Sequence, residues 1–374
     1  MTKIKKILSV LIVGVMVLSL GACDPVEPQP SMSVRASVVE IEKYGHAVLS
    51  VTAADLMAAG YGLGDMVCVR FGERAYTMPL FDGYYSNPGS LLLRASHAQA
   101  RVAVCINYGD FCAVNGISVG DTAEITLSEK AGMLAIQQLY ALQYSNKRED
   151  YADDASFANF RAVTAGRIGY GKLYRSASPV NNEKGRADYA DTLIESVGVA
   201  TILNLADSDE DIAEYLSQAD FTSDYYRALY QGGKVVAIDL TGNFYSDDFA
   251  ACVARGLTFL ARNDPPYAIH CTEGKDRAGF TAMLLEALMG ATLDEIVGDY
   301  MLSFYNYYGI TKDNDPQRYQ AVLDTNLLAM LCHVTAAESA GALGQMDLEA
   351  AVTEYLLDAG MLQADIVTLK EKLG

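Results

Sequence analysis

The chain has 374 residues, of which 51% are hydrophobic, and its formal net charge at pH 7 is -19. This length allows two folded domains, whereas the acidic balance argues against nucleic acid as a partner because its phosphates would be repelled. The seven cysteines and four histidines lack the spacing of a metal site or of a disulfide framework, so we expect no metal and no other cofactor.

Residues 1–22 have the form of a bacterial lipoprotein signal peptide. Three lysines among the first six residues precede an apolar run, and Leu20-Gly-Ala-Cys23 resembles a lipobox in which Cys23 is acylated. A conventional cleaved signal and a single spanning helix are the alternatives, although the run is short for a span. We expect residues 23–33, which are rich in proline, to form a tether. The mature chain would then lie outside the cytoplasm, anchored to the cell membrane through a lipid on Cys23.

Residues 34–128 are predicted to form a small all-β barrel or sandwich. Short runs in which apolar and polar residues alternate, such as 47–52 and 101–106, are separated by glycines. The segments 44–55 and 107–121 resemble the C-terminal barrel of the S-adenosylmethionine hydroxide adenosyltransferases. The catalytic domain of that family has no counterpart here, so the resemblance implies the fold only.

Residues 129–150 connect the two predicted domains. Apolar residues recur at helical spacing between about 129 and 146, which predicts a bridging helix. The acidic and polar residues that follow are typical of a solvated linker.

Residues 151–374 are predicted to form an α/β domain with a central, mostly parallel sheet flanked by helices. Strand-like apolar runs, such as 201–205, 234–240 and 267–270, alternate with helical periods at 247–260 and 277–289. Thr292 and Glu295 have the spacing of a capping box that begins another helix. Functional residues gather at the carboxyl ends of the strands in such folds, and one of these strands ends directly before Cys271.

The segment His-Cys-Thr-Glu-Gly-Lys-Asp-Arg-Ala-Gly, residues 270–279, has the form of an anion-binding loop that contains a nucleophile. Cys271 and Arg277 are separated by five residues, so a backbone wrapped around a tetrahedral anion would bring both side chains to it. The loop amides and the N-terminus of the following helix would also favour the reactive thiolate of Cys271. We expect the remaining loop residues to bind substrate, with His270 orienting the loop: His270, Thr272, Glu273, Gly274, Lys275, Ala278 and Gly279.

A second Cys-x5-Arg pattern, at Cys68 and Arg74, serves as an internal control. Its residues alternate like those of a strand, and no helix follows before Pro79. We therefore predict a site at Cys271 and none at Cys68.

Four stretches of the second domain together resemble one family. Asn159-Phe-Arg161, Leu173-Tyr-Arg-Ser176, Ile202-Leu-Asn-Leu205 and the loop His-Cys-x-x-Gly-Lys-Asp-Arg are similar to motifs of the bacterial tyrosine-specific and dual-specificity cysteine phosphatases. The resemblance runs from about residue 151 to the C-terminus. It implies hydrolysis of phosphotyrosine, and some members also hydrolyse phosphoserine, phosphothreonine or phosphoinositides. In wider relatives a lysine like Lys275 accompanies activity on phosphoinositides.

The expected reaction has two steps. Cys271 attacks phosphorus to form a phosphocysteine, which water then hydrolyses, while Arg277 and the loop amides hold the phosphoryl oxygens. The leaving oxygen needs a proton from a general acid. Asp276, which resembles the loop aspartate of the family, is the first candidate for this acid. Asp239, at the end of a predicted strand, is the second.

Two loop positions depart from the family pattern. Ala278 replaces a serine or threonine whose hydroxyl assists breakdown of the phosphoenzyme, so we expect slow dephosphorylation. Glu273 places a negative charge in a loop that binds anions, and should weaken substrate binding unless Lys275 or Arg161 pairs with it.

Three functions are compatible with these residues. The first is a membrane-tethered protein-tyrosine phosphatase acting on phosphorylated proteins or peptides. The second is hydrolysis of phospholipid head groups or soluble inositol phosphates, which Lys275 favours and the negative net charge opposes. The third is a pseudophosphatase that binds phosphorylated ligands with little chemistry, as Glu273 and Ala278 would suggest.

Overall fold

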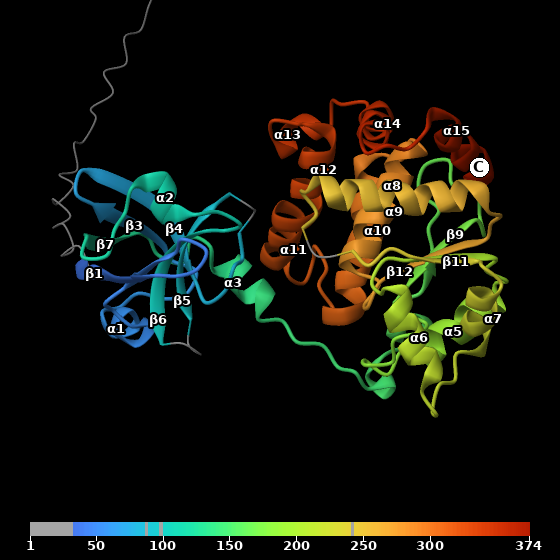
Figure 1. Cartoon of the computed structure of the whole chain (residues 1–374), viewed down its shortest axis with the longest axis horizontal. Helices are drawn as coiled ribbons and strands as arrows, with labels where there is room; N and C mark the ends of the chain where they lie inside the picture. Colours follow the sequence, from blue (N-terminus) through green and yellow to red (C-terminus); the bar gives the residue numbers. More distant parts are fainter. Residues whose placement is uncertain (1–32, 87–88, 97–99, 241–242) are drawn as a thin grey trace, which may run out of the picture.

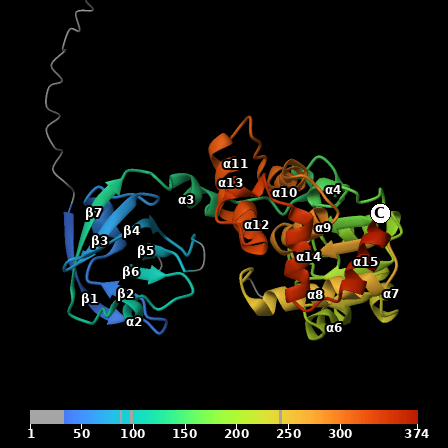
Figure 2. The same ribbon diagram turned by 90° about the horizontal axis from the view of Figure 1, so that it is seen from above.

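The computed structural model describes residues 33–374 except 87–88, 97–99 and 241–242. The predicted signal peptide, Cys23 and nearly all of the predicted tether lie outside the described residues. The described chain forms a β-barrel and an α/β part, with helix α3 (Leu134–Tyr140) between the barrel and the helical side of the α/β part (Figures 1 and 2).

The first part is a closed barrel with the strand order β1-β2-β6-β5-β4-β3-β7. Its strands are β1 (Ser33–Ile41), β2 (Ala47–Leu49), β3 (Met66–Phe71), β4 (Arg74–Phe81), β5 (Leu91–Ser96), β6 (Arg101–Ile106) and β7 (Thr122–Glu129). Alternate side chains point inward, so Val67, Val69 and Phe71 of β3 are buried in the barrel core. Two short helices lie on the connections, α1 (Ala53–Ala58) and α2 (Phe111–Asn115). The expectation of a barrel or sandwich is met by the barrel.

Cys68 and Arg74 lie in the hairpin of β3 and β4, where Cys68 pairs with Thr77. The second Cys-x5-Arg pattern therefore has the strand surroundings that its sequence predicted.

The bridging helix is shorter than predicted. β7 continues to Glu129, which pairs with Met66 of β3, and a turn containing Ala131 at φ 57° precedes α3. The predicted helix does not continue after Tyr140. The chain beyond it is held by a buried arginine, whose Nη2 donates to the carbonyl oxygen of Ser145 (Arg186, 2.9 Å). Contacts with distant residues thus flank α3 on both sides.

The α/β part contains a sheet with the order β11-β10-β12-β9-β8. Its strands are β8 (Arg161–Ala162), β9 (Leu173–Ser176), β10 (Thr201–Asn204), β11 (Val235–Ala237) and β12 (Tyr267–His270). β9, β12, β10 and β11 pair in parallel, and β8 is antiparallel to β9. β12, which leads to Cys271, is the central strand.

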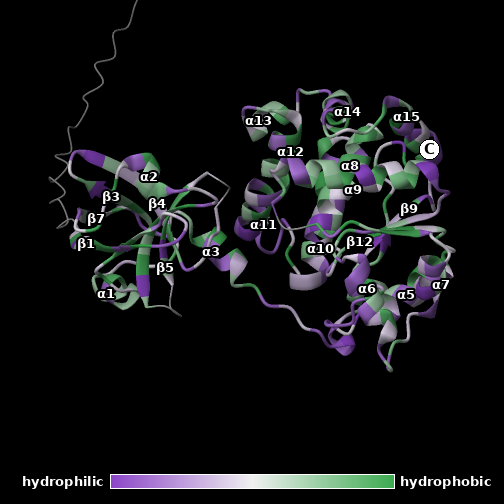
Figure 3. Ribbon diagram, viewed as in Figure 1, coloured by the Kyte–Doolittle hydropathy of each residue, from purple (hydrophilic) through white to green (hydrophobic). Residues whose placement is uncertain are grey.

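Helices cover both faces of this sheet (Figure 1). One face packs against α5 (Ala187–Ser196), α6 (Asp209–Ser217) and α7 (Asp224–Gln231), and the other against α8 (Asp247–Arg262), α9 (Asp276–Leu288) and α10 (Leu293–Tyr308). The remaining helical segments are α4 (Asp154–Phe157), α11 (Pro316–Val322), a π-helical turn (Leu323–Leu327), α12 (Leu328–Thr335), α13 (Ala340–Leu343), α14 (Leu348–Asp358) and α15 (Gln363–Leu373). In Figure 3 the strands near β9 are hydrophobic, whereas α6 and α7 carry many hydrophilic residues. Within the described ranges, no helix has both the length and the apolar character needed to cross a membrane.

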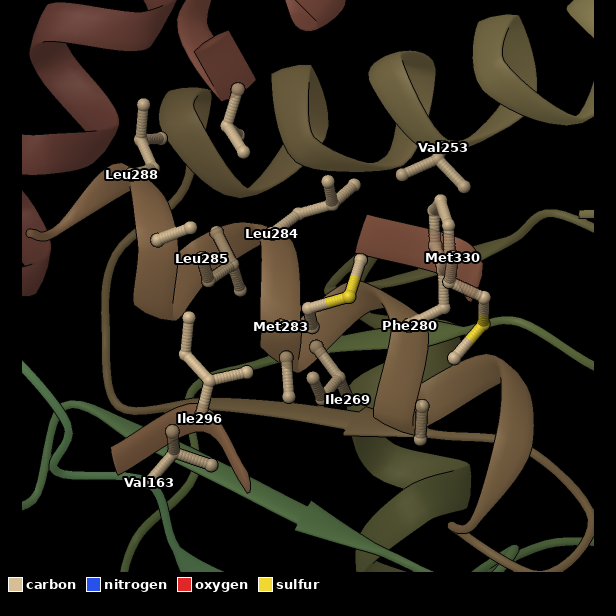
Figure 4. Packing of buried hydrophobic residues seen from close by; sticks show 14 of the residues in the cluster. Val163, Val253, Ile269, Phe280, Met283, Leu284, Leu285, Leu288, Ile296 and Met330 are labelled. Atoms are coloured by element: carbon tan, nitrogen blue, oxygen red, sulfur yellow. The ribbon is translucent and has the colours of Figure 1, made fainter. Parts of the chain in front are cut away.

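Helix α9 is the central helix of this part. Every residue from Ala278 to Leu288 is buried, and its side chains pack around Ile269 of β12, Val253 of α8 and Ile296 of α10 (Figure 4). Burial of each large apolar side chain contributes about 1.5–3 kcal/mol. The helix is therefore held firmly, and with it the loop that enters its N-terminus. The predicted helices at 247–260 and 277–289 are confirmed as α8 and α9, and Thr292 and Glu295 form the expected capping box of α10.

Candidate active site

The Cys271 loop lies at the carboxyl end of β12. The whole strand is buried, and Cys271 is 3% exposed. α9 begins at Asp276, so the loop connects a buried strand to the N-terminus of a buried helix. This is the arrangement that the sequence predicted around an anion-binding loop.

The peptide groups of the loop are oriented by donors that surround it. Four successive carbonyl oxygens accept hydrogen bonds from outside the loop: Thr272 O from Ser178 N, Glu273 O from Asn159 and Tyr307, and Gly274 O and Lys275 O from Arg175. In a trans peptide the N–H points opposite to the carbonyl, so the amides of residues 273–276 are directed to the inside of the loop. A row of inward amides is a nest for an anion.

Arg277 closes the loop. Its Nη2 donates to Thr272 Oγ1 (3.0 Å), at the beginning of the loop, and its Nη1 donates to the carbonyl oxygen of Leu240 (3.1 Å), beyond β11. The guanidinium can offer two parallel N–H groups to the oxygens of one phosphoryl group.

A buried network of charged residues supports the loop from below. Asp299 of α10 accepts hydrogen bonds from Arg161 Nε (2.7 Å) and from Arg175, which also holds two loop carbonyls. Arg161 Nη2 and Asn159 Nδ2 each donate to Ser303 Oγ (3.1 Å). Asn159, Arg161 and Arg175 lie in the sequence motifs, but their joint role with Asp299 and Ser303 was not predicted. The network links α10, β8 and β9 to the peptide groups that shape the site.

The pKa values of two buried carboxyls beneath the loop move in opposite directions. Burial raises the pKa of Asp299, but Arg161 and Arg175 outweigh it and lower the pKa to about 2. Burial and the neighbouring charge of Asp299 raise the pKa of Glu286, on α9, well above its usual value. The two arginines therefore stabilise the ionised form of Asp299, whereas burial favours the protonated form of Glu286.

Two glycines allow close packing around the loop. Gly274 has φ +67°, and a Cβ there would lie 2.3 Å from the carbonyl carbon and oxygen of Ser176. A Cβ at Gly279 would lie 2.8 Å from Tyr300 Cε2 and 3.0 Å from Arg175 Nη2. The first glycine permits a left-handed turn against β9, and the second lets α9 approach α10.

The negative charge of Glu273 is balanced locally. Lys275 Nζ lies 3.3 Å from Glu273 Oε2 and 3.8 Å from Asp276 Oδ2. Burial lowers the pKa of Lys275, but the nearby carboxylates raise it well above its usual value, so the amine stays charged. Of the two partners that were considered for Glu273, Lys275 is the one observed, whereas Arg161 pairs with Asp299.

Tyr144 is a contact of the loop that the sequence did not reveal. It belongs to the segment after α3 and donates a hydrogen bond to Glu273 Oε1. Its ring packs against Tyr307, with centroids 4.7 Å apart, and against the guanidinium of Arg186. Tyr144 lies 129 residues before Glu273 in the chain, so no local pattern could have indicated the contact.

His270 lies directly before Cys271 and is fully enclosed. Its ring has no side-chain hydrogen-bond partner among the described residues and lies edge-on to Tyr226. Burial lowers the pKa of His270 to about 3, although a hydrogen bond with the Cys271 backbone raises it. The imidazole is therefore neutral at physiological pH and packs beside Cys271.

The two predicted acids reach one cavity from different elements. Asp239, beyond β11, and Asp276, in the first turn of α9, both line a cavity of about 790 Å³ together with Lys275 and Arg277. Asp239 is exposed and has φ 49°, a backbone conformation that is uncommon outside glycine. The structure thus places both candidate acids on one cavity, which Arg277 also lines.

Asp207 is a further carboxylate near Arg277 that sequence reasoning missed. It is buried, and Asn204 Nδ2 donates to it (3.0 Å). Burial raises the pKa of Asp207, while Asn204 and Arg277 lower it. Its position just after the motif strand 202–205 was the available signal.

Comparison with known sequences places this site in a family. The sequence profile of the tyrosine phosphatase family matches residues 155–374. A tyrosine-protein phosphatase of Nostoc commune is 28% identical over 145 residues, which are 35% of this chain and 49% of that protein. A Cupriavidus necator protein provisionally named a tyrosine-protein phosphatase is 36% identical over 69 residues, 18% of this chain and 23% of that protein. The chain thus spans about half the length of the first relative and about a quarter of the second.

Solved structures show a weaker likeness. An uncharacterised conserved protein of Thermotoga maritima has a TM-score of 0.24 and 21% identity, covering 25% of this chain and 36% of that one. The catalytic core of a PP-IP phosphatase from S. cerevisiae, solved with citrate, has a TM-score of 0.28 and 20% identity. The match covers 43% of this chain and 83% of that one. Both TM-scores are low, so the assignment depends on the profile. Because that profile covers more than half of the chain and the entire Cys271 loop, the chain belongs to the tyrosine phosphatase family.

Proposed function

We propose that the chain is a phosphomonoester hydrolase that uses Cys271 as its nucleophile and acts on phosphotyrosine in proteins or peptides. The observation that carries this proposal is the convergence of the inward amides of residues 273–276 and the Arg277 guanidinium on the loop that holds Cys271. Membership of the tyrosine phosphatase family supports phosphatase activity.

The reaction proceeds through a covalent intermediate. The Cys271 thiolate forms a bond to phosphorus as the ester P–O bond breaks, and the leaving oxygen takes a proton from an aspartic acid. Water then attacks phosphorus, the P–S bond breaks, and inorganic phosphate leaves as the thiolate is restored. Amides and Arg277 hold the equatorial oxygens in both steps because the developing charge is spread over them.

Release of p-nitrophenol from p-nitrophenyl phosphate tests the proposal. We expect turnover by the wild type that vanadate inhibits, and none by Cys271→Ser, whose hydroxyl is a far weaker nucleophile. A wild type that binds phosphotyrosine peptides without hydrolysing this ester would instead be a pseudophosphatase. The ion pair of Glu273 with Lys275 reduces the support for that alternative, since the carboxylate does not oppose the anion alone.

Asp276 is the proposed general acid, with Asp239 as the alternative. Both line the cavity that Arg277 also lines. Leaving groups of different basicity separate their roles. Loss of the acid slows phenyl phosphate, a poor leaving group, more than p-nitrophenyl phosphate. We expect Asp276→Asn to show this difference and Asp239→Asn to slow both substrates equally; the reverse pattern would assign Asp239.

Because Ala278 lacks a hydroxyl, we expect the second step, hydrolysis of the phosphocysteine, to be slow. The Ala278 side chain is fully buried at the start of α9 and offers no hydroxyl to the leaving thiolate. We expect a burst of p-nitrophenol equal to about one equivalent of enzyme, followed by slower turnover. Ala278→Ser should raise the steady rate and remove the burst. Rapid-quench measurements of both variants that show no burst and equal rates would disprove this role.

Phosphotyrosine is preferred to inositol phosphates because the loop offers little free positive charge. Lys275, the residue that favours inositol phosphates, is engaged by Glu273, Asp276 and the Tyr308 hydroxyl (3.0 Å). Parallel assays of phosphotyrosine peptides, phosphoinositide vesicles and soluble inositol phosphates test the preference. A higher kcat/KM for either inositol substrate would replace the proposed specificity.

The proposed location is the outer face of a bacterial membrane, with a lipid on Cys23. The lipobox-like sequence supports it. Cells that express the full chain should incorporate labelled palmitate into it, and Cys23→Ser should abolish both labelling and recovery in the membrane fraction. Equal recovery of the two proteins with membranes would remove the support for a lipid anchor.

A further inference from the structure

A cavity beside the C-terminal end of the Cys271 loop is lined by both parts of the molecule. Lys275, Asp276 and Arg277 line it on the α/β side, whereas Tyr84 and Tyr108 of the barrel and Tyr140 of α3 line it as well. The cavity has a volume of about 790 Å³, which is larger than one phosphorylated side chain requires. We call Tyr84, Tyr108 and Tyr140 the aromatic wall.

Buried polar groups hold the barrel side of the aromatic wall in place. The Tyr84 hydroxyl hydrogen-bonds to His46 Nδ1 (3.1 Å) and accepts from Arg94. Arg94 Nη2 donates to Glu42 Oε1 (2.7 Å), and the other oxygen of the same carboxylate hydrogen-bonds to His46 Nδ1 (3.1 Å). His46 and Arg94 are both buried. The network fixes the Tyr84 ring while leaving it 41% exposed, so an ordered aromatic surface faces the cavity.

Tyr108 is presented in a constrained turn. Its φ is 54°, and a bridge between Ile106 and Gly109 closes the turn around it. Its side chain is 71% exposed. A tyrosine in the left-handed region has a conformational cost. In this turn, the costly conformation places an exposed ring at the border of the cavity.

Helix α3 couples the barrel to the α/β part. Gln137 Nε2 donates to Asp82 Oδ1 of the barrel (2.9 Å), and the Tyr140 ring stacks on Tyr85 with centroids 4.2 Å apart. Leu139, from the same helix, packs in the core that contains α8 and α9. One helix therefore contacts both parts and sets the distance of the aromatic wall from the loop.

The chemistry of the lining indicates the kind of occupant. Among the described residues that line the cavity, the only cations are Lys275 and Arg277, and Lys275 is already paired with Glu273. A ligand with several phosphates would meet too little positive charge, and Asp239 and Asp276 would repel it. Aromatic rings suit the neutral side chains and peptide groups of a polypeptide.

We propose that the aromatic wall selects polypeptide substrates by contacting the residues that flank the phosphorylated tyrosine. The barrel is thereby a specificity element of the active site, an inference that rests on the proposed function. Tyr84, Tyr108 and Tyr140 do not touch the reacting atoms, so small esters bypass them.

The test compares a peptide with a small ester in the full chain. Tyr108→Asn removes the ring and keeps a residue that tolerates positive φ. Tyr44→Asn is the matched control, because Tyr44 is also on the barrel and 67% exposed but does not line the cavity. We expect Tyr108→Asn to lower kcat/KM for phosphotyrosine dodecapeptides about tenfold. Turnover of p-nitrophenyl phosphate should change less than about twofold, and Tyr44→Asn should change neither. Tyr140→Leu, which removes the stack on Tyr85, should give the same substrate-dependent loss.

The outcomes separate the two proposals. No hydrolysis of p-nitrophenyl phosphate by the wild type would overturn the proposed function and this inference with it. Hydrolysis of the ester with unchanged peptide kcat/KM in Tyr108→Asn and Tyr140→Leu would overturn the inference alone. Equal losses of kcat/KM on peptide and ester in these variants would also overturn it, as would a loss confined to inositol hexakisphosphate.

Discussion

Gly274 is the residue whose replacement should distort the loop most directly. Its φ of +67° and the contact with Ser176 leave no room for a side chain. We expect Gly274→Ala to displace the loop amides and lower kcat/KM roughly a hundredfold, since misplacement by about 1 Å can cost that much. The strained backbone should also lower the free energy of unfolding by about 1–2 kcal/mol.

Gly298→Ala is the control for that variant. Gly298 lies within α10, and a Cβ there meets open space, so alanine should stabilise the helix by up to about 1 kcal/mol. Ester hydrolysis and urea unfolding of both variants give the comparison. Full activity in Gly274→Ala would show that the loop does not depend on this close approach.

Single residues also show what the sequence could predict and what it could not. The strand-loop-helix arrangement around residues 270–279 was predictable because an apolar strand period and a helical period lie on either side of Cys271 and Arg277. The partners of the loop were not, because Asp299 lies 138 residues from Arg161 and 124 from Arg175.

At the scale of elements, α10 supports the loop through Asp299. Removing one partner of a buried ion pair leaves the other charge uncompensated, so Asp299→Asn should lower the free energy of unfolding at pH 7 by about 3–5 kcal/mol. The folded pKa of Asp299 is lowered to about 2 from a usual value of 3.8. Its contribution is therefore complete above about pH 4 and is lost as the pH falls toward 2.

Urea unfolding at several pH values checks this prediction. The difference between wild type and Asp299→Asn should be constant from pH 7 to about pH 5 and shrink below pH 4. Asp365→Asn is the control, because its partner Arg262 is exposed and such surface pairs contribute about 1 kcal/mol or less. A difference that widened on acidification would have the wrong sign for an ionised Asp299.

The element between the two parts was predicted least well. Helical spacing from 129 to 146 predicted one long helix. In the structure, Glu129 belongs to strand β7, and Arg186 binds the chain beyond α3. Both competing interactions join residues far apart in sequence. The strands and helices of the α/β part were easier to predict because their apolar periods agree with the contacts they make.

We expect Arg186 to restrain the segment after α3. It donates to Ser145 O (2.9 Å) and Asn146 Oδ1 (3.2 Å), and its guanidinium stacks near Tyr144. Lysine cannot supply this planar set of donors. Arg186→Lys should therefore make the Tyr144 peptide bond several-fold more susceptible to chymotrypsin, whereas Arg255→Lys, at an exposed position on α8, should not. Equal cleavage rates would mean that Arg186 does not restrain the segment.

The charge of the whole molecule predicts an unusual response to salt. At a net charge of -19, the protein repels the anions it is proposed to bind. Raising the ionic strength from about 0.02 to 0.2 M shortens the screening length severalfold, so kcat/KM for a doubly phosphorylated peptide should rise. Uncharged inert osmolytes serve as the control. A fall in kcat/KM with salt would indicate that local cations at the loop govern association.

The closed barrel has a consequence for how this protein can change over generations. Because β1 pairs with β7 and closes the barrel, its sheet has no free edge strand with which another chain could pair. Its core side chains and its rim are also largely separate sets, so mutations at the tips of the connections alter neither closure nor core. Under the proposed specificity, preferences for different polypeptides could change there while the residues of the Cys271 loop stay unaltered.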